Sequence, residues 1–389
     1  MTKKGYAPLP AWVAEESGAA DETLSAVLRT AMEQELARTR VPGAQAVLLR
    51  DGKLLWSACA GHPSLAARHS LRTDPDTRPI GRGDRFVIAS VTKLVVATVT
   101  MSLAERGELN LDGTIDRWLP ELPNADRITI RMLLSHGSGL REYFKDNWIR
   151  EQMKDNPLRH WSRSEVIDAI ARLGAEAQPG ERFAYRNSNY LAVGEILELA
   201  TGKRIGELVE EHVSRPLGLG TLSFAEKHPG NGRLASPYTR RLRRFADPLR
   251  RTGGHLPSDA MGEVWTDGGI ATSAEDLAAL TDTLFGGRLL RAETVQEMST
   301  PPGYGESAFA RLLRVALPRT PDIGYGLGVL VQQRGEDARL LGHNGMYLGW
   351  SAITSFDARS RLTVTVLTNL LRLPVPAQRL EQKLRSALA

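Results

Sequence analysis

The sequence contains a single cysteine, Cys59, in 389 residues. One thiol cannot form an intrachain disulfide, and it cannot supply the thiolate cluster of a structural zinc site. The eight histidines include no pair at the helical spacing of metal ligands. We therefore expect no metal and no other cofactor.

Long apolar runs are absent as well, and no stretch is apolar enough to span a bilayer. The first ten residues carry two lysines, but the apolar segment of a secretory signal does not follow them. These absences predict a protein without a membrane partner and with a cytoplasmic location.

A strong charge of either sign is also missing. Lysine and arginine number 50 against 45 acidic residues, so the formal net charge is only +5, and no nucleic-acid-binding motif accompanies it. We therefore expect no nucleic-acid partner. One local exception is the segment 238–251, which holds six arginines. It fits either a solvated loop or a lid that meets an acidic substrate or carrier.

Apolar periodicity predicts strands at both ends of the chain and helices between them. The clearest expected elements are a helix over 21–40, a hairpin of 44–50 and 53–57 around Asp51-Gly52, helices through 113–260, strands at 339–341, 350–356 and 362–368, and a closing helix over 376–388. Distant strands with helices inserted between them imply one sheet. The sequence predicts an α/β (α+β) fold with a sheet domain, 1–112 plus 261–389, and a mainly helical domain, 113–260. A small-molecule cleft is expected between the two.

The most informative motif is Ser90-Val91-Thr92-Lys93, which lies where an extended run gives way to helix-forming sequence. A spacing of three residues puts the hydroxyl and the amine on one helix face. The N–H groups and the dipole at the start of that helix would favour negative charge beside the serine. Because a serine hydroxyl is a weak nucleophile until a base takes its proton, the pattern indicates an activated nucleophile.

Two further motifs follow in order along the chain. The segment Tyr185-Arg186-Asn187 precedes a helical run, and His343-Asn344-Gly345-Met346 enters a strand near the end of the sequence. Three motifs in a fixed order are far more specific than any one of them. Three further matching segments are 133–140, 267–277 and 325–328.

With these motifs the chain resembles the serine β-lactamase and penicillin-binding-protein superfamily, in its class C-like branch, over residues 22–385. That branch includes D-alanyl-D-alanine carboxypeptidases, D-amino-acid amidases and aminopeptidases, family VIII-type esterases and acyltransferases. The resemblance implies a five-stranded antiparallel sheet flanked by helices, with an all-helical domain covering one end of the cleft.

The resemblance and the residue chemistry together assign roles. Ser90 would attack an acyl carbonyl, while Lys93 and Tyr185 share the transfer of its proton. Which of the two carries the proton stays open, because their titrations are coupled. Asn187 would bind Lys93 and the substrate. The N–H of Ser90 and, by analogy, that of Met346 would hold the oxyanion, and the strand residues Asn344 and Gly345 complete the expected substrate site.

Two positions bear on the substrate. Arg186 replaces the small residue usual in this branch, so it either points to solvent or binds an acidic substrate. His343 stands where β-lactamases of this branch carry lysine and resembles the histidine of carboxypeptidases, aminopeptidases, amidases and some esterases, and it is counted with the catalytic residues. We therefore do not expect efficient β-lactam hydrolysis.

The function predicted is a serine hydrolase that cleaves a small-molecule ester or amide. The alternatives are an acyltransferase that passes the acyl group to an amine or alcohol, a D-alanyl-D-alanine carboxypeptidase, a β-lactamase, and a binding protein with a silent site. Three other features are interpreted as structural: the loop His136-Gly137-Ser138-Gly139, the glycine-rich strand 324–328 and Tyr190, which continues an apolar helix face. The oligomeric state stays open.

Overall fold

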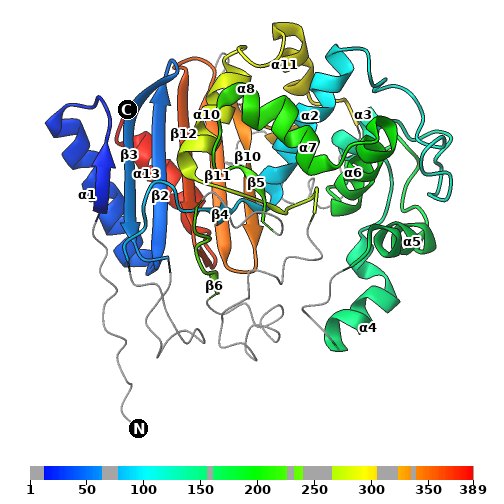
Figure 1. Cartoon of the computed structure of the whole chain (residues 1–389), viewed down its shortest axis with the longest axis horizontal. Helices are drawn as coiled ribbons and strands as arrows, with labels where there is room; N and C mark the ends of the chain where they lie inside the picture. The colour runs from blue at the N-terminus through cyan, green and yellow to red at the C-terminus, as the bar shows by residue number, and fades with distance from the viewer. Residues whose placement is uncertain are drawn as a thin grey trace.

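The computed structural model describes residues 13–63, 78–155, 161–225, 232–239, 265–304, 323–333 and 339–388. A large antiparallel sheet runs through the molecule, with helices on both faces and a helical region at one end (Figure 1). Eight strands form the sheet. Their spatial order is β1 (Val13–Ser17), β3 (Lys53–Gly61), β2 (Gly43–Arg50), β12 (Leu362–Thr368), β11 (Trp350–Asp357), β10 (Arg339–Tyr347), β9 (Leu330–Gln333) and β8 (Ile323–Tyr325).

The mixed α/β fold is confirmed, but the expected number of five strands is wrong. Five strands, β3, β2, β12, β11 and β10, form the middle of the sheet, and β1, β9 and β8 extend its two edges. The additional strands are only 5, 4 and 3 residues long. Such short segments carry too few side chains to show an apolar alternation, so their pairing depends on tertiary context.

The expected hairpin and first helix are confirmed. Asp51 and Gly52 join β2 and β3 with φ angles of 51° and 76°, the paired positive values of a tight hairpin turn. Helix α1 (Glu22–Thr39) begins after Asp21, whose carboxylate accepts the N–H of Leu24, and ends at Arg40 in a left-handed conformation. Local turn and cap chemistry therefore sets these boundaries.

Helices cover both faces of the central strands. Helix α13 (Pro376–Ser386) packs on β11 and β12, and α1 packs beside it on α13 and β3. Helix α10 (Ala274–Phe285) packs on the other face of the sheet, against β2, β11 and β12. All seven residues of β12 are buried, as expected for a strand covered on both sides. Two apolar cores result. One lies between the sheet and the two helices α1 and α13, and a larger one continues into the helical region.

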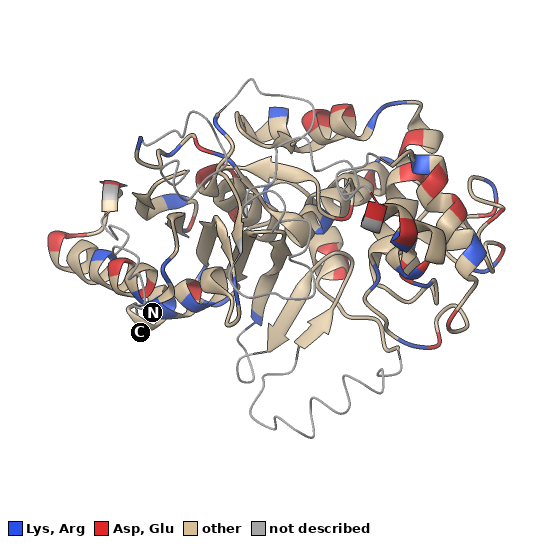
Figure 2. Ribbon diagram, turned by 90° about the horizontal axis from the view of Figure 1, so that it is seen from below, with Lys and Arg blue, Asp and Glu red and all other residues tan. Residues whose placement is uncertain are grey.

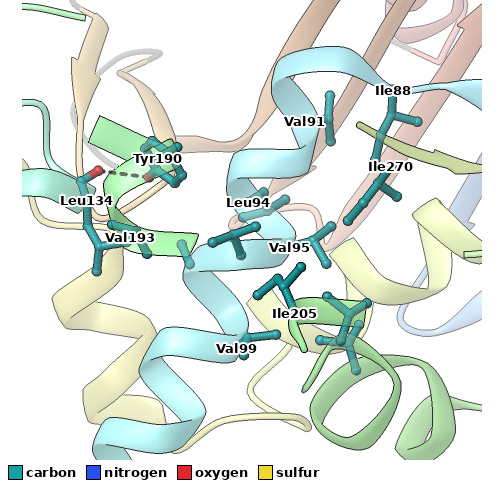
Figure 3. Packing of buried hydrophobic residues seen from close by; sticks show 14 of the residues in the cluster. Ile88, Val91, Leu94, Val95, Val99, Leu134, Tyr190, Val193, Ile205 and Ile270 are labelled. Atoms are coloured by element: carbon teal, nitrogen blue, oxygen red, sulfur yellow. Dashed lines mark hydrogen bonds between the residues drawn. The ribbon is translucent and has the colours of Figure 1, made fainter. Parts of the chain in front are cut away.

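Helix α2 (Thr92–Glu105) is the central element of the larger core. Its side chains Leu94, Val95 and Val99 pack among residues that come from distant parts of the sequence, including Val193, Ile205 and Ile270 (Figure 3). The remaining helices are α3 (Ile130–Leu134), α4 (Asn147–Asp155), α5 (Arg163–Leu173), α6 (Asn187–Thr201), α7 (Ile205–Val209), α8 (Arg215–Leu217) and α11 (Ala292–Met298), with a π-helical turn at Glu210–Ser214 and 3₁₀ turns at Ala89–Val91 and Tyr143–Lys145. Short strands β4 (Phe86–Val87), β7 (Ile270–Thr272) and β5 (Ser223–Phe224) form a small sheet, and β6 (Tyr238–Thr239) pairs with β13 (Leu370–Leu371).

The boundaries proposed for the two domains stay a prediction. The arginines of the segment 238–251 lie outside the described residues. Acidic and basic residues are interspersed along the described ribbon seen from below (Figure 2). Within the described part of the chain, no helix is long and apolar enough to cross a membrane, and no cluster of three potential metal ligands occurs.

Candidate functional site

Ser90 lies in a strained turn between strand and helix. Strand β4 ends at Val87, Ala89 has a φ of 48°, and the 3₁₀ turn Ala89–Val91 leads into α2. A positive φ is uncommon for a residue with a Cβ, and such strain persists only where surrounding contacts hold it. Strand β7 provides these contacts, since the Ile270 carbonyl accepts the N–H of Ile88 at 2.9 Å. Ser90 is half-buried while both of its chain neighbours are buried.

The structure brings Ser90, Lys93 and Asn187 together. The Lys93 side chain is fully buried. Its Nζ lies 3.2 Å from Ser90 Oγ, 2.8 Å from Asn187 Oδ1 and 2.6 Å from the carbonyl oxygen of Asp267. An ammonium has three protons to donate, and three acceptors surround it here. A neutral amine at the same place would accept the serine proton along the first of these contacts.

Tyr185 lies in an aromatic cluster beside this lysine. Lys93 Nζ lies 5.1 Å from the centroid of the tyrosine ring. The ring centroids of His136, Tyr325 and His343 are 4.3, 5.8 and 6.4 Å from that of Tyr185. The Tyr185 ring therefore lies beside the Lys93 amine, and packed rings fix its orientation. Its part in proton transfer stays a prediction.

His343 is buried and neutral. Its Nδ1 lies 2.6 Å from the carbonyl oxygen of Asn344, which can only accept, so the ring donates there and its Nε2 accepts the hydroxyl of Tyr325 at 3.0 Å. Burial, together with the charge of Lys93, lowers the pKa of His343 to about 3. Both nitrogens are thus occupied by the protein, and the ring offers no positive charge to a substrate carboxylate.

Strand β10 passes very close to Ser90. A Cβ on Gly345 would lie 2.0 Å from the carbonyl oxygen of Ile88 and 3.0 Å from the nitrogen of Ser90, so only glycine permits this approach. The side chains of Asn344 and Met346 line a groove with residues of α1 and α13. The role of Asn344 in substrate binding stays a prediction, and so does the role of the Met346 N–H in stabilising the oxyanion.

Gly345→Ala should separate β10 from Ser90. Because the new Cβ would overlap backbone, the strand must shift, and a displacement near 1 Å can cost about 10²-fold in rate. We expect kcat/KM to fall by that order and stability by about 1–3 kcal/mol. Gly206→Ala is the matched control, since nothing lies within 4 Å of its added Cβ. Wild-type kinetics of the Gly345 variant would contradict the close contact.

The guanidinium of Arg186 is engaged within the protein. Its Nη2 lies 2.6 Å from the Glu176 carboxylate and its Nη1 donates to the carbonyl of Tyr185 at 2.7 Å. These contacts tie down the loop before α6, so the side chain does not simply point to solvent. Binding of an acidic substrate by Arg186 stays a prediction.

The loop His136–Gly139 supports Tyr185. His136 has a φ of 60°, and its Nδ1 accepts the backbone N–H of Arg186 at 3.3 Å and the amide of Asn189 at 2.9 Å. The ring proton therefore resides on Nε2. Burial, with the charge of Lys93, keeps the pKa of His136 well below its ordinary value. Ser138 donates to Asn189 Oδ1 at 2.5 Å, which agrees with the structural interpretation of this loop.

Two buried carboxyls lie near Lys93, and neither is identified from the sequence as a functional residue. Glu142 accepts the backbone N–H of Asn187 at 3.0 Å, and Asp267 is buried beside the same lysine. Burial raises the pKa of Asp267. Burial, and then the negative charge of Asp267, raises the pKa of Glu142 to about 7 against the opposing effects of the Asn187 N–H and of Lys93. Asp267 opens a segment that matches the family, but an isolated glutamate such as Glu142 gives no sequence signal.

The raised pKa of Glu142 predicts a pH-dependent effect on stability. The folded protein holds this proton more tightly than the unfolded chain, so the stability that it contributes is present below about pH 4.3 and is lost as pH rises through about 7. Glu142→Gln removes the titration. The unfolding free energy of the variant relative to wild type should therefore increase from pH 4 to pH 8, by up to about 3 kcal/mol. Chemical denaturation of both proteins between pH 4 and pH 8 measures this change. A difference in unfolding free energy that stays constant with pH would contradict the raised pKa of Glu142.

Comparisons with known proteins agree with this fold. The beta-lactamase family model matches residues 28–389. Esterase EstB of Burkholderia gladioli is 31% identical over 227 residues, which are 56% of this chain and 55% of that protein, so the matched part is about half of the esterase. Monacolin J acid methylbutanoyltransferase of Aspergillus terreus is 28% identical over 81% of this chain and 79% of its own. A structure of D-amino acid amidase from Ochrobactrum anthropi SV3 complexed with D-phenylalanine has a TM-score of 0.74 at 22% identity, covering 94% of this chain and 99% of its own. At this identity the likeness shows the fold.

Proposed function

Since the chain belongs to the beta-lactamase family, we propose that it is a serine hydrolase that cleaves a small-molecule ester or amide through an acyl-enzyme on Ser90. One observation supports this most strongly: the buried Lys93 Nζ lies 3.2 Å from Ser90 Oγ and 2.8 Å from Asn187 Oδ1. A buried amine in contact with a half-buried serine is the pairing that an activated nucleophile requires.

Acylation of Ser90 involves two proton transfers. Ser90 Oγ attacks the acyl carbonyl while its proton passes to the pair of Lys93 and Tyr185, and the same pair then protonates the leaving alcohol or amine. The backbone N–H groups of Ser90 and Met346 stabilise the oxyanion, each by about 3 kcal/mol. Attack by water on the ester at Ser90 releases the acid and regenerates the hydroxyl.

The neutral histidine in β10 supports a substrate without a carboxylate at that position. A lysine there would pair its charge with such a group, whereas His343 is uncharged and bonded to Tyr325 and to its own strand. Efficient hydrolysis of β-lactams is therefore not expected of this site. The esterase relative supports an ester, and the amidase-like fold is compatible with an amide.

Acyl transfer is the second candidate. The methylbutanoyltransferase relative is matched over 79% of its length, more fully than the esterase at 55%. Both reactions share one acyl-enzyme and differ in whether water or another nucleophile takes the acyl group. A carboxypeptidase activity and a silent binding site are the remaining alternatives, and the same experiment addresses them.

A substrate panel with defined acceptors tests the proposal. Nitrophenyl esters of short acids, D- and L-amino acid amides, a D-alanyl-D-alanine peptide and a cephalosporin are incubated with wild type and Ser90→Ala, with and without an added alcohol or amine. We expect ester or amide turnover that depends on Ser90, with the cephalosporin much slower. A new ester or amide product in the presence of acceptor would favour the transferase. Absence of Ser90-dependent turnover throughout the panel would favour a silent site.

A further inference from the structure

A buried carboxyl lies at the beginning of α6, outside the groups that carry out the proposed reaction. Glu142 is 6% exposed. Its Oε2 accepts the backbone N–H of Asn187 at 3.0 Å, while its Oε1 is buried and has no hydrogen-bond partner among the described residues. Such a carboxylate is costly to bury. It is also too enclosed to contact a substrate, so any part in the reaction must act through its neighbours.

Charged groups face Glu142 from several elements packed around it. Lys93 comes from α2, Asp267 from the segment 265–269, and Arg186 from the residue before α6. Asp267 Oδ1 accepts the N–H of Trp265 at 3.2 Å, and the Asp267 carbonyl holds Lys93 Nζ. Arg186 is paired with Glu176. Lys93 therefore lies among two buried carboxyls, and the ionisation of either one changes the field at its amine.

We propose that Glu142 is a positioning residue that holds Asn187 against Lys93 through the backbone N–H and whose charge sets the protonation equilibrium of the pair formed by Lys93 and Tyr185. The inference rests on the proposed function, because it concerns the base that activates Ser90. It follows from the position of the Glu142 carboxyl. One of its oxygens accepts the N–H of Asn187, the residue that binds Lys93, and the other has no hydrogen-bond partner among the described residues.

The sign of the effect follows from electrostatics. An ionised Glu142 favours the ammonium form of Lys93, so a higher pH is needed to generate the neutral amine. A neutral group at position 142 has the opposite effect. Because the pKa of Glu142 is about 7, its ionisation occurs near neutral pH, where a general base works best, and the two titrations are coupled.

Glu142→Gln tests the proposal, because the amide oxygen can still accept the N–H of Asn187 while the charge is removed. Two pH profiles are measured: kcat/KM for the best substrate of the panel, and the rate at which a fluorophosphonate labels Ser90. We expect the acid limb of both profiles to move to lower pH by about 1 unit and to become steeper. Glu142→Ala, which also removes the acceptor, should in addition lower the labelling rate at every pH.

Glu195→Gln is the matched control. Glu195 is a half-buried carboxyl on α6 whose pKa is also raised by burial, but it pairs with Arg163 at 3.5 Å. Its replacement should leave the acid limb where it is in wild type. If Glu142→Gln does not fold, Asp267→Asn must shift the limb in the same direction, because it removes the other carboxyl that faces Lys93.

The outcomes separate the inference from the function on which it rests. The inference is overturned if the acid limb of the pH profile does not move in Glu142→Gln, or in Asp267→Asn where that variant replaces it. A uniform fall in rate without such a shift is what a purely structural role predicts. A wild-type protein that is not labelled at Ser90 overturns the proposed function itself.

Discussion

Replacing Ser90 with alanine is expected to abolish turnover, with kcat/KM falling by at least about 10³-fold. The reason is that the proposed reaction acylates the Ser90 hydroxyl, whose oxygen lies 3.2 Å from Lys93 Nζ. The fold should be retained, because the change removes one oxygen from a half-buried residue and leaves Lys93 bonded to Asn187 and Asp267. Steady-state kinetics and a thermal melt of the same preparation measure both effects.

Ser138→Ala is the matched control for this variant. Ser138 lies in the loop that supports Tyr185 and donates to Asn189, so its loss should cost about 1 kcal/mol of stability. The rate should stay within about 10-fold of wild type, since the loop contributes no reacting atom. Residual activity above a few per cent in Ser90→Ala, or a complete loss in Ser138→Ala, would point to a different nucleophile.

Tyr185→Phe is expected to lower kcat/KM by about 10² to 10⁴-fold. The ring would remain packed against His136 and Tyr325, so the variant removes the oxygen that we propose transfers the proton, and little else. The loss should be larger for an amide than for a nitrophenyl ester, because an amine leaving group needs a proton and a nitrophenolate does not. Rates for a matched pair of substrates measure this difference.

Tyr190→Phe separates chemistry from packing. The Tyr190 ring is fully buried, and its hydroxyl donates to the carbonyl of Leu134 at 2.9 Å (Figure 3). Its removal should cost about 1 kcal/mol of stability and leave the proton transfer in place. A near-normal rate in Tyr185→Phe, equal for ester and amide, would assign the proton to Lys93 alone.

Much of the fold could be predicted from the sequence because local patterns determine it. The helix over 21–40, the hairpin at Asp51-Gly52 and the strand over 362–368 have clear periodicity and turn or cap residues, and the structure confirms them. The burial of Tyr190 was also predicted correctly, since the residue continues an apolar helix face. In each case one short segment carries the whole signal.

The remaining features depend on contacts between distant segments. The edge strands β1, β8 and β9 form only because a neighbouring strand is available. The pairing of Arg186 with Glu176 and the burial of Glu142 result from how the loops before α6 fold back. Sequence patterns report local preference and periodicity, so they cannot identify which lone charged residue becomes buried beside a distant lysine.

Covalent labelling of the nucleophile tests the central claim most directly. The wild-type protein is incubated with a fluorophosphonate, and the adduct is located by intact-protein and peptide mass spectrometry. We expect a single adduct on Ser90, abolished in Ser90→Ala, strongly slowed in Tyr185→Phe and retained in Tyr190→Phe. A protein that stays unlabelled, or an adduct on another residue that persists in Ser90→Ala, would contradict the assignment of Ser90 as the residue that carries the acyl group.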